Sequence, residues 1–269
     1  MKHRDRGFTL VELLVVVTII VILIAMLIPT LEQARVAAER AKCLSNLHAI
    51  GRASSLYLND NKNTYAGVYH WHGLLGKYGV YEPGSTSHPQ VLNPGLRPLN
   101  AYLGYPHGST QMAPGAVPFT ATGVGIGPAI DPMEVPVAEC PSDVGDPLWG
   151  GSNNAYKEFG TSYIVTVIPY HFHIGQLFGN LQAPGAYPSA KSTQIKPLAS
   201  KVLVTDWPVY GNRWWSNSRT RWHSNDPNKR EINTAFADGH AELTEYELDK
   251  IDGEHGGTDG PPNPSWHWW

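Results

Sequence analysis

The chain opens with a short charged leader and a long apolar segment that few folds can accommodate. The apolar segment runs from Phe8 to Ile28 and contains one charged residue, Glu12. As a helix rising about 1.5 Å per residue, it spans roughly 30 Å, the thickness of the hydrocarbon core of a bilayer. It exceeds the apolar stretch of about 7–15 residues in an ordinary secretory signal. Residues 8–28 are therefore predicted to form a transmembrane helix.

The residues before this segment set its expected orientation. Residues 1–7 form a leader with three basic side chains, Lys2, Arg4 and Arg6. Basic residues favour the cytoplasmic side of a membrane. The protein is thus expected to cross the inner (cytoplasmic) membrane once, with its N-terminus in the cytoplasm and the remaining residues outside.

The apolar segment continues without a turn signal into a second helical stretch, residues 29–60. Pro29 lacks a backbone N–H and should bend the helix where it leaves the membrane. The polar cluster 59–61 is predicted to end the helix. An apolar stripe should face the rest of the protein, and it is predicted at Ala34, Ala38, Ala41, Leu44, Leu47 and Ile50.

Glu12 places a carboxylate inside the apolar segment. A charge in a membrane is costly, so it needs a partner or a shallow position. One interpretation is a glutamate near the lipid headgroups of a plain anchor. The other depends on cleavage after Gly7, which exposes a positive amine on Phe8. Glu12 of one subunit then neutralises that amine on a neighbouring subunit.

The sequence Gly7-Phe8-Thr9-Leu10-Val11-Glu12 resembles the processing site of type IV prepilins and type II secretion pseudopilins. The resemblance implies cleavage after Gly7 by a prepilin peptidase, methylation of the Phe8 amine, and a role for Glu12 in subunit register. Pro29 matches the helix-bending proline of pilins. The implied partners are other pilins or pseudopilins, the prepilin peptidase and an inner-membrane assembly platform.

From residue 61 onward the composition becomes aromatic, Gly-rich and Pro-rich, which defines a head of residues 61–269 outside the cytoplasm. Asp238-Gly239 between two alternating runs predicts a hairpin turn. Segments 82–136 and 178–197 are predicted to be long loops. Strands are predicted at 162–168, 201–206, 232–237 and 240–243. The predicted fold is α+β and pilin-like, with the long N-terminal helix packed on an antiparallel sheet.

His223, Asp238 and Gly239 carry a second resemblance. They match the large prepilin-type head of planctomycete and verrucomicrobial proteins, in which a fixed spacer separates a His from Asp-Gly. That family has nine residues in the spacer, whereas this chain has fourteen, residues 224–237. The extra residues are expected in the polar loop 225–230. The resemblance implies no activity.

The chain has two cysteines, Cys43 and Cys140. One pair cannot supply a Cys-rich tetrahedral zinc site. An exported head permits a disulfide, which would tie the helix to the loop 140–143. The alternative is two unpaired, buried thiols.

Catalytic motifs are lacking in this sequence. It contains neither Gly-x-Ser-x-Gly nor His-Glu-x-x-His, and hydrolysis needs a nucleophile beside an oriented base. Asp206, His223, Asp238 and His240 are expected to form a polar cluster around the hairpin with a structural role. The protein is therefore predicted not to be an enzyme, and an anchored hydrolase is the least favoured function.

Two groups of residues in the sequence are candidates for metal binding. His70 with His72, and His171 with His173, each place two imidazoles on one face of a strand, but neither pair has a third ligand in the sequence. Pseudopilins bind calcium in a C-terminal loop, and the comparable carboxylates here are Asp252, Glu254 and Asp259. The segment lacks the EF-hand pattern. Surface histidines and a solvated acidic loop are favoured, so no cofactor is expected.

These patterns favour a structural subunit of a type IV pilus-like filament or a type II secretion pseudopilus, and they do not separate the two. The alternative is a membrane-anchored surface binding protein whose Trp-rich head holds a polysaccharide, because Trp residues concentrate at 207–269. Only 16% of residues are charged and the formal net charge is −3, which argues against nucleic-acid binding.

Overall fold

The computed structural model describes residues 9–68, 74–77, 79–81, 90–92, 97–105, 134–145, 154–165, 179–180, 189–208, 222–223 and 231–245. Within them the fold is the predicted α+β arrangement of a long N-terminal helix and an antiparallel sheet. The chain divides into two compact units, Met1–Ala38 and Glu39–Trp269.

Helix α1 spans Leu10–Asp60 as one continuous element of 51 residues. Pro29 lies inside it without ending it, and the helix stops at the predicted polar cluster. The first unit contains residues 10–38 of α1, and residues 39–60 belong to the second. Burial within α1 is confined to this second part, at Cys43, Asn46, Leu47, Ile50, Gly51, Ala53, Ser54 and Leu58.

The predicted apolar stripe was wrong over much of its length. Leu47 and Ile50 are buried, but Leu44 is only partly buried, and Ala34, Ala38 and Ala41 are exposed. Each residue of an α-helix turns by about 100°, so a step of three falls about 60° short of a full turn. A run of such steps leaves one face of the helix. The observed stripe mixes steps of three and four and therefore stays on one face.

The main sheet has four antiparallel strands in the order β4-β6-β7-β8. Its members are β4 (Tyr163–Val165), β6 (Val202–Asp206), β7 (Glu231–Phe236) and β8 (Ala241–Glu245). All four strand predictions are confirmed within the described residues, with ends shifted by one or two residues; residues 166–168 lie outside them. β6 lies between β4 and β7 and is buried along its whole length, as expected for a strand covered on both faces.

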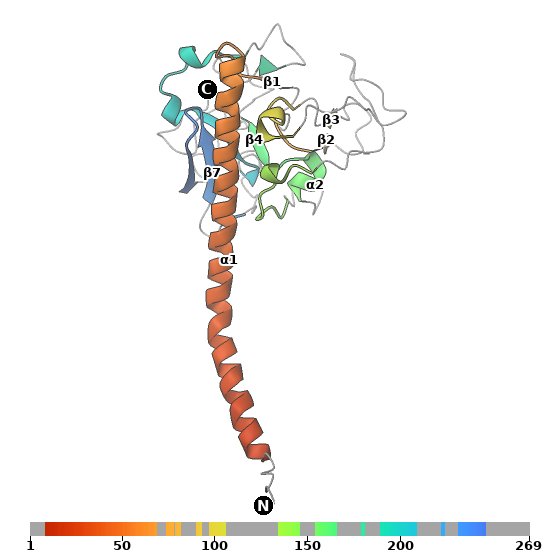
Figure 1. Ribbon diagram of the computed structural model, residues 1–269, viewed down its shortest axis with the longest axis vertical. Helices are drawn as coiled ribbons and strands as arrows, with labels where there is room; N and C mark the ends of the chain where they lie inside the picture. The colour runs from red at the N-terminus through yellow and green to blue at the C-terminus, as the bar shows by residue number, and fades with distance from the viewer. Residues whose placement is uncertain are drawn as a thin grey trace, which may run out of the picture. The chain divides into compact units, whose positions relative to one another are not determined.

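The second part of α1 packs on this sheet (Figure 1). Near its start, Arg40 bonds Glu231 at the beginning of β7. Almost two turns further along the helix, Asn46 donates a hydrogen bond to the hydroxyl of Tyr163 on β4. Contacts to both strands hold the helix across the sheet.

The other elements of the head are short. The segments predicted to be long loops contain some of them, because two or three residues can pair or turn where the sequence shows no extended pattern. They are β1 (Gly67–Val68) paired parallel with β5 (Gly179–Asn180), β2 (Gly79–Tyr81) paired antiparallel with β3 (Gln90–Leu92), α2 (Ala155–Phe159), and the 3-10 turns Ala101–Leu103, Pro136–Ala138, Ser192–Gln194 and Leu198–Ser200.

Candidate functional site

The start of α1 is built by a reciprocal pair of hydrogen bonds. Thr9 precedes the helix, and its backbone N and Oγ1 donate to Glu12 Oε2 at 2.8 Å and 2.7 Å. In return, the backbone N of Glu12 donates to Thr9 Oγ1 at 3.3 Å. This is a capping box, in which a Thr and a Glu three residues later satisfy otherwise unpaired N–H groups. The predicted cleavage residues Gly7 and Phe8 lie outside the described residues.

The capping box gives Glu12 a partner that the sequence interpretations overlooked. The signal was present, since Thr-x-x-Glu before an apolar run is a recognised helix start. Both residues lie after the predicted cleavage position, so processing leaves the box intact. Any test of Glu12 must therefore separate its charge from its role as a cap.

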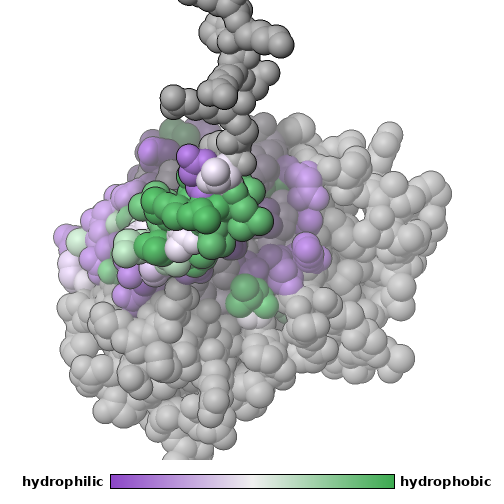
Figure 2. All heavy atoms as spheres, turned by 90° about the horizontal axis from the view of Figure 1, so that it is seen from below, coloured by the Kyte–Doolittle hydropathy of each residue, from purple (hydrophilic) through white to green (hydrophobic). Residues whose placement is uncertain are grey.

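The first part of α1 exposes its apolar side chains on every side. The large apolar residues from Leu10 to Leu31 are each between 47% and 81% exposed. They form the continuous green surface in Figure 2. By length and composition α1 can cross a membrane, and none of its most apolar window is buried. A surface of this kind needs lipid or other helices around it.

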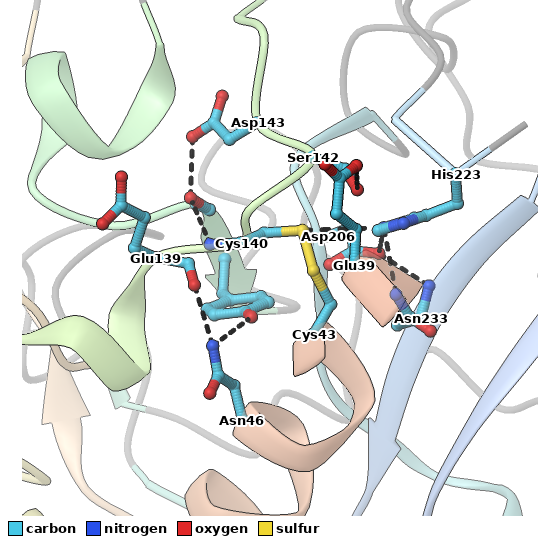
Figure 3. Close-up of a disulfide and its surroundings, with 12 residues drawn as sticks. Glu39, Cys43, Asn46, Glu139, Cys140, Ser142, Asp143, Asp206, His223 and Asn233 are labelled. Carbon is cyan, nitrogen blue, oxygen red and sulfur yellow. Dashed lines mark hydrogen bonds and ion pairs between the residues drawn. A yellow bond between two sulfur atoms is a disulfide. The ribbon is translucent and has the colours of Figure 1, made fainter. Parts of the chain in front are cut away.

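A disulfide joins the second part of α1 to the head (Figure 3). Of the two arrangements considered for the cysteines, the structure contains the bond between Cys43 and Cys140, whose Cα atoms are 5.1 Å apart. That distance lies within the usual range for disulfides. Both residues are buried, and 97 positions of sequence separate them.

Asp143 organises the loop that carries Cys140. Its carboxylate accepts hydrogen bonds from the backbone N of Gly145, Ala155 and Tyr156, each at 2.9 Å, and from Ser162 Oγ at 2.7 Å. Burial raises the pKa of the Asp143 carboxyl, and these hydrogen bonds oppose that rise. The carboxylate thereby fixes the start of α2 and the approach to β4.

His223 lies beside the disulfide, in a buried polar cluster. Its Nε2 is 2.7 Å from Asp206 Oδ2, 2.9 Å from Asn233 Nδ2 and 3.8 Å from Cys140 Sγ. The backbone N of Asn233 also donates to Asp206 Oδ2, at 2.7 Å. Asp206 and Asn233 come from the neighbouring strands β6 and β7. All four residues are essentially inaccessible to solvent.

The cluster expected around the hairpin is in fact two separate clusters. Asp206 and His223 belong to the buried one, whereas Asp238 bonds His240 at the partly exposed turn between β7 and β8. The reason is the turn itself, which holds Asp238 at the end of the hairpin, beyond the strand residue Asn233. His223 and the Asp238-Gly239 pair, which carry the second resemblance, thus play separate roles.

Gly239 is the point where the hairpin turn meets α1. Its φ of +92° suits a glycine. A Cβ placed on Gly51 of α1 would lie 2.8 Å from the carbonyl oxygen of Gly239. Two glycines therefore allow the helix and the turn to approach with backbone against backbone. The sequence predicted the turn but gave no sign of this contact.

The buried cluster lacks the geometry of a nucleophile–base–acid triad. In such a triad the nucleophile and the acid bind opposite nitrogens of the histidine. Here Cys140 and Asp206 both face Nε2 of His223. Trp207 and Trp222 are buried in the core, so neither offers a sugar-stacking surface.

Several predicted residues lie outside the part of the chain that the structure describes. They are the histidine pairs 70/72 and 171/173, the spacer loop 225–230, the calcium candidates Asp252, Glu254 and Asp259, and the Trp-rich terminus from Trp266. The predictions made for them stay predictions.

Comparison with known proteins points to the N-terminal region. Residues 2–28 match the family model of the prokaryotic N-terminal methylation motif. The N-terminal region of the chain is prepilin-like. Within the matched residues lie the Gly7-Phe8 junction and Glu12.

The relatives of this prepilin-like protein include pseudopilins. Type II secretion system core protein G of Dickeya chrysanthemi is 31% identical over 90 residues, 34% of this chain and 58% of that protein. The protein of the same name from Klebsiella pneumoniae is 40% identical over 59 residues, 22% of this chain and 42% of that protein. The chain thus spans about half the length of these curated relatives. No solved structure matches it.

Proposed function

We propose that this prepilin-like protein is a structural, non-enzymatic subunit of a type II secretion pseudopilus or a type IV pilus-like filament. The observation that carries the proposal is the first part of α1, where an all-round apolar surface begins with a single carboxylate, Glu12. A plain anchor needs only the apolar surface. The motif match and the similarity to core protein G of type II secretion systems support assembly.

In this proposal the helix exchanges one apolar environment for another. A prepilin peptidase cleaves after Gly7 and methylates the Phe8 amine. An inner-membrane platform then moves the helix out of the bilayer, and contacts with neighbouring helices replace contacts with lipid. The basic leader keeps the N-terminus in the cytoplasm beforehand, and the head decorates the filament outside.

Glu12 then serves twice. Within its own chain it caps α1 through Thr9. Within the filament its negative charge neutralises the Phe8 amine of a neighbour, since an unpaired charge is costly among packed apolar helices. Two substitutions separate these roles. Glu12→Ala removes both, whereas Glu12→Gln keeps an acceptor for the capping box and removes only the charge.

The test compares wild type, Glu12→Ala and Glu12→Gln in membrane fractions and in filaments sheared from the cell. Both variants should insert into the membrane as well as wild type and be cleaved after Gly7, because the altered side chain lies four residues beyond the cleaved bond. Both should be depleted from the filament fraction. Mass spectrometry of the N-terminal peptide checks that each mature chain starts at a methylated Phe8.

The three possible outcomes point to different conclusions. Depletion of both variants supports charge neutralisation between subunits. Depletion of Glu12→Ala alone assigns the defect to the lost cap. If both variants reach the filament fraction like wild type, or no such fraction contains the protein, the anchored binding protein becomes the better description.

A further inference from the structure

Three polar atoms converge on one nitrogen of the buried His223. Asp206 Oδ2, Asn233 Nδ2 and Cys140 Sγ lie 2.7, 2.9 and 3.8 Å from Nε2. Among the described residues, Nδ1 of the same ring has no hydrogen-bond partner. Figure 3 shows these side chains arranged around the imidazole, next to the disulfide.

This convergence is poorly satisfied by hydrogen bonds alone. An imidazole nitrogen carries either one proton or one lone pair. The Asp206 carboxylate requires a proton on Nε2, whereas the Asn233 amide nitrogen is a donor and requires a lone pair there. Oδ1 of each of these two partners also lacks a hydrogen bond among the described residues. A cation bound at Nε2 would use its lone pair together with those of the nearby sulfurs.

The sulfurs complete a set of metal ligands. One ligand atom from each of Cys43, Cys140 and His223 lies within 4.8 Å of the others, and all three residues are buried. With Zn–S near 2.3 Å and Zn–N near 2.0–2.1 Å, a tetrahedral site separates its ligand atoms by roughly 3.3–3.8 Å. The distance of 3.8 Å between Cys140 Sγ and His223 Nε2 already fits. The bond between the two sulfurs prevents them from binding a metal as thiolates in the oxidised protein.

We propose that, when this disulfide is reduced, Cys43, Cys140 and His223 bind one zinc-like divalent cation, with the fourth position taken by water or an external ligand. An external dithiol supplies two electrons and two protons, the S–S bond breaks, and the dithiol leaves as a disulfide. The two thiols then release their protons as the cation binds. Thiolate and imidazole ligands select Zn²⁺ or Co²⁺ over Mg²⁺ and Ca²⁺.

The metal and the disulfide would hold the same parts of the head together. Cys43 belongs to α1, Cys140 to the loop before α2, and His223 to the segment between β6 and β7. Either cross-link therefore anchors the helix beside the sheet, and the redox environment decides which one forms. This proposal concerns the head alone and does not depend on filament assembly.

The experiment uses the full chain in detergent and Co²⁺ alone as the probe. The protein is reduced and unfolded in urea without oxygen, then refolded with or without Co²⁺. Circular dichroism reports folding, and the visible and near-ultraviolet spectra report tetrahedral geometry and thiolate bonding. One Co²⁺ per chain is expected in the refolded protein, with both spectral signatures. The oxidised protein should bind none at this site.

Three variants identify the ligands. Cys43→Ala/Cys140→Ala should lose the thiolate signature completely. His223→Gln should weaken Co²⁺ binding by at least roughly tenfold, in line with the loss of metal-site interactions elsewhere. Asp206→Asn leaves the three proposed ligands in place and should still bind one Co²⁺ with both spectral signatures. Urea-unfolded wild type measures the affinity of the two thiols without the folded site.

Each alternative result is decisive. A His223→Gln spectrum and affinity equal to wild type would show that His223 is not a ligand, and the site as proposed would be wrong. Binding no tighter than in the unfolded chain would also overturn it. If the reduced chain fails to refold, Co²⁺ must restore folding in wild type, since the metal is proposed to replace the disulfide. Failure to do so rejects the proposal.

Discussion

The two parts of α1 are the same secondary structure with opposite surroundings. Along residues 10–31 of the first part, the large apolar side chains are exposed on every side of the helix. Along residues 39–60 one stripe is buried against the head, and a disulfide and an Arg–Glu pair reinforce it. The apolar segment of the first part is apolar on all sides, as in helices surrounded by lipid or by other helices. The second part is amphipathic, as in helices that pack one face against a protein.

This contrast indicates where the stability of the protein comes from. The second part is covered by residues of its own chain, so its side chains should contribute to the free energy of unfolding of the head. The first part is not covered by the described residues, so lipid or other helices are expected around it. Changes there should affect insertion or assembly and leave the head unchanged. The following predictions test that division.

The largest effect is expected from removing the disulfide. Cross-linking positions 97 residues apart restricts the unfolded chain, and the chain-entropy model gives about 4–5 kcal/mol for such a loop. Cys43→Ala/Cys140→Ala should lower the free energy of unfolding of the head by about this amount, measured by urea denaturation in detergent. Membrane insertion should be unaffected.

Non-reducing peptide mapping of the exported protein is the companion measurement. It should recover the peptides of Cys43 and Cys140 linked. Because both residues are buried, the folded protein should resist alkylation after mild reductant and react only once urea is added. Two freely alkylated thiols in the native exported protein would refute the cross-link.

A matched pair of leucines compares the two parts directly. Leu47 is fully buried and Leu23 is 55% exposed. Leu47→Ala should destabilise the head by roughly 2–5 kcal/mol, through lost burial and the cavity left behind. Leu23→Ala removes the same atoms from a surface that the head does not cover, so the urea midpoint should stay at the wild-type value. A similar shift for both would mean that the two parts are not energetically separate.

The sequence predicted the fold better than it predicted which side chains pack. Its strands have alternating apolar residues and an Asp-Gly turn, which are local signals, and all four were found. The buried face of α1 was harder, because alanines such as Ala38 and Ala41 fit either a core or a surface. Which face is buried depends on where the sheet lies, and that is a long-range property.

The same limit applies to the candidate sites. The Thr9–Glu12 capping box is local in sequence, and its Thr-x-x-Glu pattern alone is sufficient to predict it. Cys140 lies in a loop, Asp206 at the end of β6 and His223 in the segment after it, and these residues come into contact only in the folded protein. No spacing in the sequence predicts these contacts. The contact of Gly51 with Gly239 is equally long-range.

At Gly51, the sign of the change in the free energy of unfolding on substitution by alanine is the test. In an exposed helix interior, Gly→Ala gains roughly 1 kcal/mol. At Gly51 the new Cβ would meet a backbone carbonyl at 2.8 Å, and overpacking costs typically about 1–3 kcal/mol. Gly51→Ala should therefore destabilise the head, measured by urea denaturation. Ser45→Ala, at an exposed position of the same helix, should change stability by no more than about 0.5 kcal/mol. A stabilised Gly51→Ala variant would mean that the helix and the turn are not in close contact.

The smallest effect compares two helix caps. Asn154 caps α2 inside the head, where its Oδ1 accepts from the backbone N of Lys157 at 2.9 Å and its Nδ2 donates to the carbonyl of Asp143. Thr9 caps α1 in the exposed first part. Loss of an N-cap typically costs about 1 kcal/mol of helix stability. Asn154→Ala should therefore lower the free energy of unfolding of the head by about that amount, and Thr9→Ala should leave it unchanged.

The Thr9 cap instead protects the first turn of α1, so its loss should appear as faster amide hydrogen exchange near Glu12 in detergent micelles. Faster exchange at the helix start, together with an unchanged urea midpoint, would show that the two ends of α1 are stabilised independently. A shift of the urea midpoint by Thr9→Ala would contradict the division into two parts.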